Sequence, residues 1–115
     1  MPTSHAPYPK TARLRRERDF APVRRIGRRW LGAQAQFRVL ANRQGAPRLG
    51  IATPRRYGGS VRRNRFRRLL REAFRLSAGD LGSIDFLVEP RRDLEEPTLA
   101  GLSADLRAAA AGARR

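Results

Sequence analysis

The stretch VRRNRFRRLLREAFR, residues 61 to 75, decides the fold of this chain. Its apolar side chains recur at intervals of three and four residues, which is the spacing of one stripe along an α-helix. The stripe consists of Phe66, Leu69, Leu70, Ala73 and Phe74. The pattern predicts a helix from about Val61 to Arg75 that buries this stripe against the core.

The opposite face of the predicted helix is almost wholly cationic. At about 100° per residue, one side carries Asn64, Arg68, Arg71 and Arg75, flanked by Arg65 and Arg67. Like charges at these spacings destabilise a helix by about 0.2–0.5 kcal/mol per pair, and Glu72 is the only acid in the stretch. A solvated charged face is the ordinary alternative. Because folding alone does not favour this pattern, and because arginine and asparagine suit phosphate and 2′-hydroxyl groups, we expect the face to bind RNA.

A short segment just upstream, PRRYGGS, adds two more cations, Arg55 and Arg56. Ser60 is the expected N-cap of the helix, whose positive end can approach a phosphate. Two interpretations of the segment remain open. Tyr57 and the following glycines either contact RNA or serve only the core and the turn.

The charge of the whole chain supports a polyanionic partner. Its 115 residues include 26 Lys and Arg against 10 Asp and Glu, a net charge of +16. The excess is uneven, because residues 1–76 hold 21 basic and 3 acidic side chains whereas residues 77–115 hold 5 and 7. Nucleic acid is the expected partner. A membrane surface is not, because the apolar residues of the basic segments are needed for the core.

Composition also excludes several kinds of site. There is no cysteine, so disulfides and thiolate metal sites are impossible, and His5 is the only histidine. The sequence has no apolar run of about 20 residues and no signal-peptide block at its start. We therefore expect a soluble cytoplasmic protein with one RNA-binding domain over residues 13–111, after a flexible tail at 1–12 and before a basic end at 112–115.

The remaining elements follow from shorter patterns. Leu14, Phe20 and Val23 fit a helix with Asp19 as N-cap, Pro22 in its first turn and Gly27 at its end. Strands are expected at 34–41, 48–53 and 85–89, a loop at 77–83, and possible further strands are left open. A last helix is expected with Pro97 near its first position and one packing face, formed by Leu99, Leu102, Leu106 and Ala109.

The run RLGIATPRRYGGSVRRNRFRRLLREAFR, residues 48 to 75, resembles the signature of the bacterial ribonuclease P protein family. Arg63, Asn64 and Arg65 match the family's arginine, asparagine, arginine motif. The resemblance extends on both sides, to the first predicted helix, to Phe37 in the first strand and to DFLVEPR, which ends in Arg91. It covers roughly Leu14 to Arg107.

The resemblance implies a fold and a function. The fold is α+β, a two-layer α/β sandwich like domain 2 of ribosomal protein S5, with a left-handed βαβ crossover. The function is that of the non-catalytic protein subunit of ribonuclease P, which binds the catalytic RNA and the 5′ leader of precursor tRNA. The RNA and Mg²⁺ then carry out the hydrolysis that frees the mature tRNA 5′ end. No DNA partner is expected.

The resemblance also implies roles for particular residues. The surface for the catalytic RNA comprises Arg63, Asn64, Arg65 and Arg68, supported by Arg55, Arg56, Arg62, Arg67 and Arg71. The candidates for leader binding are Phe20, which can stack on an unpaired base, together with Phe37, Arg38 and Arg91. Some positions depart from the family pattern, namely Pro22, Arg24, Leu40, Thr53 and Pro54, and all of them bear on the leader cleft.

Two other functions compete with this one. A structural ribosomal RNA-binding protein would share the size, charge and fold, and composition does not separate the two. An autonomous ribonuclease is disfavoured, because acid-base cleavage needs a paired acid and base, and one histidine with scattered acids does not supply them.

Overall fold

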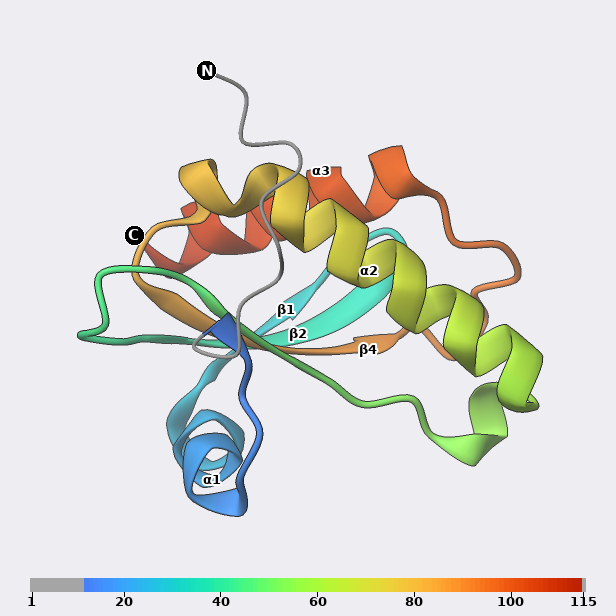
Figure 1. Ribbon diagram of the computed structural model, residues 1–115, viewed down its shortest axis with the longest axis horizontal. Helices are drawn as coiled ribbons and strands as arrows, with labels where there is room; N and C mark the ends of the chain where they lie inside the picture. The colour runs from blue at the N-terminus through green and yellow to red at the C-terminus, as the bar shows by residue number, and fades with distance from the viewer. Residues whose placement is uncertain (1–11, 115) are drawn as a thin grey trace.

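The computed structural model describes residues 12–114, in which one four-stranded sheet is combined with three α-helices (Figure 1). The expected tail at 1–12 and His5 lie, except for Ala12, outside the described residues. In chain order the elements are α1 (Glu17–Ile26), β1 (Arg28–Leu31), β2 (Ala35–Ala41), β3 (Arg48–Ile51), the 3-10 helix η2 (Arg55–Tyr57), α2 (Ser60–Leu81), β4 (Ile84–Pro90) and α3 (Leu99–Ala113). No helix within 12–114 is long and apolar enough to cross a bilayer.

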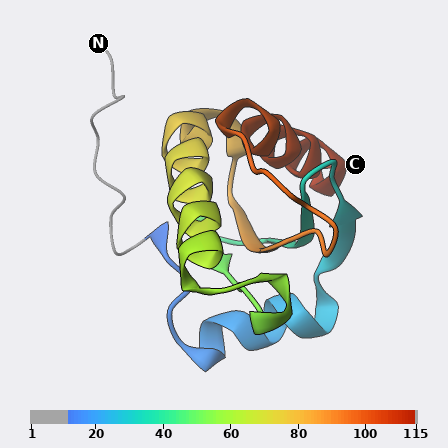
Figure 2. The same ribbon diagram turned by 90° about the vertical axis from the view of Figure 1, so that its right-hand side faces the viewer.

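The strand order β1-β2-β4-β3 confirms the α+β class. β2 pairs antiparallel with both β1 and β4, whereas β3 runs parallel to β4. A parallel pair needs a crossover, and α2 supplies it between β3 and β4. α2 and α3 lie side by side over one face of the sheet, while α1 lies against the other (Figure 2).

The predicted stripe of α2 forms the centre of the core. Phe66, Leu70, Ala73 and Phe74 are buried, and Leu69 is partly buried against them. The Phe74 ring meets Phe86 of β4 edge to face, with 6.4 Å between the ring centroids. The spacing of the apolar residues thus predicted correctly which side of the helix packs on the sheet.

The helix is longer than the sequence indicated. The segment expected to be a loop at 77–83 continues α2 to Leu81, and Ser77 and Leu81 are both buried. Gly82, with a φ of 81°, follows the helix in a conformation that glycine tolerates best. Ser60 is not the N-cap either, because Gly59 occupies that position and Ser60 begins the helix.

The first helix also starts earlier than predicted. Arg16 is the N-cap of α1, and Asp19 lies in the first turn, where its carboxylate accepts hydrogen bonds from the backbone N–H groups of Arg16 and Arg15 at 3.2 and 3.3 Å. Pro22 therefore falls inside the helix. Gly27 does end it, as predicted, and a Cβ there would lie 2.3 Å from the Val23 carbonyl oxygen.

Leu14 is not part of α1. It is buried in an extended segment beside β3, where its backbone N–H donates to the Leu49 carbonyl at 3.0 Å. At the other end of the chain, Thr98 caps α3 and Pro97 precedes the cap. Leu99 is 36% exposed and so lies off the packing face that buries Leu102, Leu106 and Ala109.

Candidate nucleic-acid interface

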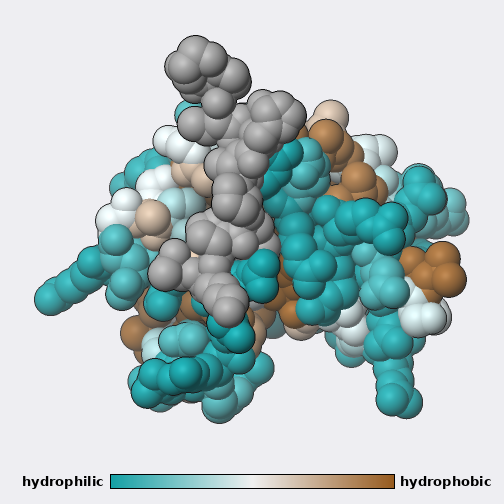
Figure 3. All heavy atoms as spheres, in the orientation of Figure 1, coloured by the Kyte–Doolittle hydropathy of each residue, from teal (hydrophilic) through white to brown (hydrophobic). Residues whose placement is uncertain are grey.

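The outer face of α2 is open to solvent along most of its length. Asn64, Arg65, Arg68 and Arg71 are exposed, and the guanidinium groups of Arg68 and Arg71 have no partner within residues 12–114. Hydrophilic side chains dominate this face in Figure 3. Arg75 differs from the others, because it binds Glu72 at 2.5 Å and is only 20% exposed. The hydrogen bond and charge of Arg75 lower the pKa of Glu72.

Two of the predicted arginines are already engaged by the segment between β4 and α3. Arg65 forms an ion pair with Glu96, and the Arg62 guanidinium donates to the Leu94 carbonyl. No pattern in the sequence predicted these contacts, because about 30 residues separate the partners. Arg67 donates to the Thr53 hydroxyl at 3.1 Å, which ties α2 to the end of β3.

The structure of the segment before α2 decides whether Tyr57 contacts RNA or belongs to the core. The Tyr57 ring is 4% exposed and meets Phe66 edge to face, so it belongs to the core. The Arg62 guanidinium lies 4.5 Å from the centre of the same ring, and a Cβ on Gly58 would approach Arg62 Cδ to 2.6 Å. Arg55 and Arg56 remain exposed beside the helix start.

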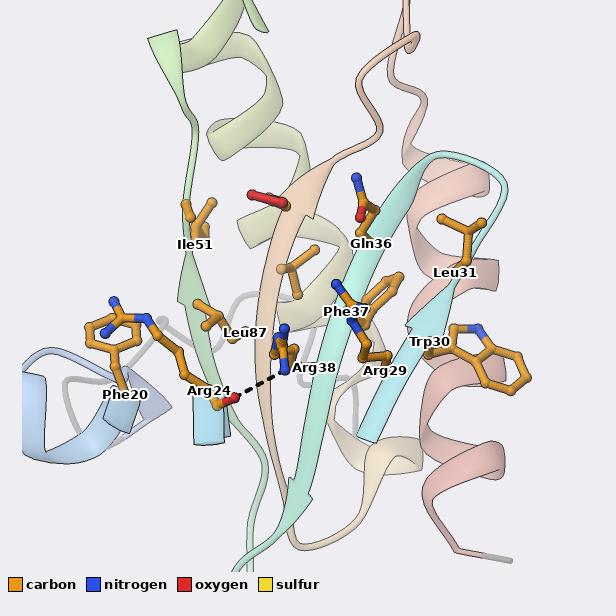
Figure 4. Close-up of a pocket in the computed structure, with 13 residues that line it drawn as sticks. Phe20, Arg24, Arg29, Trp30, Leu31, Gln36, Phe37, Arg38, Ile51 and Leu87 are labelled. Carbon is orange, nitrogen blue, oxygen red and sulfur yellow. Dashed lines mark hydrogen bonds between the residues drawn. The ribbon is translucent and has the colours of Figure 1, made fainter. Parts of the chain in front are cut away.

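A hollow of about 660 Å³ lies beside α1, on the face of the sheet opposite α2 and α3 (Figure 4). Phe20 and Arg24 border it from α1, and Arg29, Arg38 and Leu87 come from the strands. The Arg24 guanidinium lies 5.4 Å from the centre of the Phe20 ring, and Arg38 donates to the Arg24 carbonyl at 3.0 Å. An aromatic ring among arginines suits a single-stranded nucleic acid.

Gly50 explains how Phe20 reaches this position. A Cβ at Gly50 would lie 2.4 Å from Phe20 Cε1, so the ring packs directly on the backbone of β3. A second hollow, of about 550 Å³, lies on the other side of Phe20 and is lined in part by Arg13, Arg15, Arg67 and Arg71. Phe20 therefore lies between the first hollow and the cationic face of α2.

Not every predicted leader-binding residue lies beside Phe20. Phe37 borders the hollow, but its side chain is 3% exposed and belongs to the core between the sheet and the helices, so we assign it to the core instead. Arg91 directly follows β4 and is not among the residues that line the hollow; its guanidinium donates to the Gly32 carbonyl at 3.2 Å. Arg38 is the predicted residue that does accompany Phe20.

One acid near the start of α1 is stabilised in its charged form. Burial opposes the ionisation of Asp19, but the N–H groups of Arg16 and Arg15 and the charge of Arg48 outweigh it and lower its pKa. No group of three His, Cys, Asp or Glu side chains that could hold a metal occurs within 12–114.

Comparisons with known proteins point to one family. A family model described as Ribonuclease P matches residues 8–114 of the chain. A ribonuclease P protein component from Halorhodospira halophila is 41% identical over 98 residues, which cover 83% of this chain and 80% of that protein. A ribonuclease P protein component from Chlamydia trachomatis serovar D is 35% identical over 104 residues, covering 90% of this chain and 86% of its own.

Solved structures agree with the sequence matches. The RNase P protein from Thermotoga maritima is similar with a TM-score of 0.72 at 30% identity, over 82% of this chain and 90% of that one. A Staphylococcus aureus RNase P protein gives a TM-score of 0.76 over 91% of this chain and 97% of its own. Its identity is 24%, so this second likeness concerns the fold alone.

Proposed function

The chain belongs to the ribonuclease P protein family, and on that premise we propose that it is the protein subunit of a cytoplasmic ribonuclease P. In this role α2 binds the catalytic RNA, and the hollow beside α1 holds the 5′ leader of precursor tRNA. The holoenzyme then removes the leader in a reaction that depends on Mg²⁺. The protein binds and positions RNA without supplying a catalytic group.

The observation that carries the proposal is the division of α2 into two faces. The inner face is committed to the core through Phe66, Leu70 and Phe74, so the helix cannot turn its arginines inward. Arg68 and Arg71 lie outward and pair with no carboxylate of residues 12–114, although each unpaired like charge costs stability. A phosphate backbone removes this repulsion and gains charge-assisted hydrogen bonds.

The leader part of the proposal rests on Phe20 and its neighbours. A ring packed against Gly50 offers a flat surface on which one unpaired base can stack. Arg24 and Arg38 border the same hollow and can neutralise the phosphates on either side of that base. The second hollow, with Arg67 and Arg71, provides a cationic connection to the catalytic-RNA surface.

The described residues do not fit a Mg²⁺ site of their own. Magnesium prefers several oxygen ligands in octahedral geometry, and no cluster of three acidic or imidazole side chains exists within 12–114. Under the proposal the metal ions belong to the RNA, where they supply the activated water and stabilise the leaving oxygen. The arginines act by lowering the charge repulsion between the two RNA molecules.

A reconstitution tests the proposal. The protein is mixed with a bacterial ribonuclease P RNA and a precursor tRNA at a low Mg²⁺ concentration at which the RNA alone is slow. We expect faster cleavage at the mature 5′ end with the protein, and a larger gain for a precursor with a leader of several nucleotides than for one with a single nucleotide. A structural ribosomal protein would bind RNA without stimulating cleavage, and that result would reject the proposal.

A further inference from the structure

The open face of the sheet presents its side chains in parallel rows. Alternate residues of a strand point to the same face, and paired residues on neighbouring strands lie side by side. One row contains Arg29, Arg38 and Leu87, and the Phe20 ring lies at its end over Gly50. The next row, about 7 Å further along the strands, contains Leu31, Gln36 and Glu89. Figure 4 shows Leu31 and Gln36 beyond Arg29 and Arg38 along the same strands.

A negatively charged residue such as Glu89 is not expected in this hollow if only phosphates bind there. It is the one carboxylate among the described residues that line the hollow, which also include Arg24, Arg29 and Arg38. Asp85 shares the open face, but Arg48 neutralises it at 2.7 Å. Among residues 12–114, Glu89 has only a distant partner, Arg56 at 4.0 Å, and its side chain is 33% exposed. A carboxylate in this position repels a phosphate but accepts hydrogen bonds from a base.

The two other members of the row suit a base as well. The Gln36 amide has no hydrogen-bond partner within residues 12–114, so it is available both to donate and to accept. Leu31 is 63% exposed and provides an apolar surface for the face of a ring. The row therefore combines an apolar surface, an amide and a carboxylate.

We infer that Glu89 and Gln36 read one leader nucleotide and prefer guanine. The Watson–Crick edge of guanine carries two adjacent donors, N1–H and N2–H, beside the acceptor O6. The carboxylate oxygens of Glu89 accept from the two donors, and the amide of Gln36 donates to O6. The other bases each place an acceptor next to their donor, and this acceptor would face the carboxylate. This inference rests on the proposed function, because it assumes that the leader occupies the hollow.

The test uses the reconstituted holoenzyme and precursor tRNAs in which each leader position in turn is guanine, adenine, cytosine, uracil or inosine. At one position we expect the kcat/KM for guanine to exceed that for adenine or uracil by about fivefold or more. Inosine, which lacks the 2-amino group, should fall between guanine and adenine. Glu89→Gln should reduce the guanine preference at that position to less than about twofold. Glu95→Gln removes the same charge outside the hollow and should preserve the preference.

The outcomes separate this inference from the proposed function. If the protein does not stimulate cleavage of any precursor, the proposed function fails, and the inference fails with it. If it stimulates all leader variants equally, prefers another base, or keeps its guanine preference in Glu89→Gln, the function stands and the base-reading role is wrong. A preference that is lost in Glu89→Gln but kept in Glu95→Gln supports the inference.

Discussion

Arg48 and Asp85 form a bidentate ion pair between the two parallel strands, with Nε 2.8 Å from Oδ1 and Nη2 2.7 Å from Oδ2. The Asp85 side chain is 6% exposed and also accepts a hydrogen bond from the Asn42 amide at 2.7 Å. The hydrogen bond to Asp85, which outweighs burial, raises the pKa of Arg48. The pair fixes the start of β3 beside the start of β4, where the crossover that carries α2 returns to the sheet.

We predict that Arg48→Met destabilises the protein by about 3–5 kcal/mol, because it leaves a buried carboxylate without its cation. Urea unfolding measures the loss. Arg43→Met is the matched control, since Arg43 is exposed in the turn between β2 and β3. The double variant Arg48→Met with Asp85→Leu should recover much of the stability. Equal stability of Arg48→Met and Arg43→Met would contradict the assignment.

Asp19 should make stability depend on pH in the acid range. Its folded pKa lies below the ordinary value of 3.8, so the unfolded chain binds the proton more readily than the folded protein does. The stability that Asp19 contributes is therefore present above about pH 4 and is lost as the pH falls through its folded pKa. Comparison of the wild type with Asp19→Asn by urea unfolding across this range should show the difference shrinking toward acid pH. A constant difference would rule out the charge as its cause.

The outer arginines of α2 should control RNA affinity through phosphates. Arg65→Ala and Arg68→Ala are each expected to weaken binding of the catalytic RNA and to reduce the salt slope by about one. If about six phosphates are neutralised, log affinity should fall with log salt with a slope near −5 by the rule for duplex DNA. The control is Arg107→Ala, on the exposed side of α3, which should change neither the RNA affinity nor the salt slope. A complex insensitive to salt would refute this account.

Phe20 should distinguish substrates by their leaders. Phe20→Ala is expected to weaken binding of a precursor with a leader by about fivefold to a hundredfold through lost stacking, and to leave binding of mature tRNA unchanged. Gly50→Ala should have a similar effect without removing the ring, because the added Cβ displaces Phe20. Both are measured as affinity of the holoenzyme for the two RNAs.

The control for that experiment is Phe37, which sequence similarity had placed beside the leader. Phe37→Leu should lower the unfolding free energy by about 1 kcal/mol or more, because the ring is buried, and should leave leader discrimination intact. Loss of leader discrimination in a stably folded Phe37→Leu variant would contradict the assignment of Phe37 to the core.

The sequence predicted elements whose information is local. The stripe on α2 and the alternation in β2 appear within a few residues of each other, and both match the structure. It missed the last turns of α2, because Gly79 and Asp80 resemble a loop unless the burial of Leu81 is known. It also missed β1, whose four residues are mostly exposed and too few to show a pattern.

The candidate site was likewise predictable only where its information is local in the sequence. The cationic face follows from helical spacing alone, whereas the hollow depends on strands that meet only in the folded chain. Without the family resemblance, nothing in the sequence would bring Phe20 close to Arg38. The pairing of Glu96 with Arg65 was equally invisible, since it joins segments about 30 residues apart.

That pairing has a consequence for how RNA binds. In the free protein the Glu96 carboxylate already forms an ion pair with Arg65, and the Leu94 carbonyl already accepts a hydrogen bond from Arg62. An RNA phosphate that binds either arginine competes with a ligand supplied by the protein itself, and an exposed ion pair such as Arg65–Glu96 opposes binding by no more than about 1 kcal/mol. A ligand with one or two phosphates gains little from this exchange. A folded RNA that also engages Arg68 and Arg71 gains much more, and the competition thereby favours large structured partners over short ones.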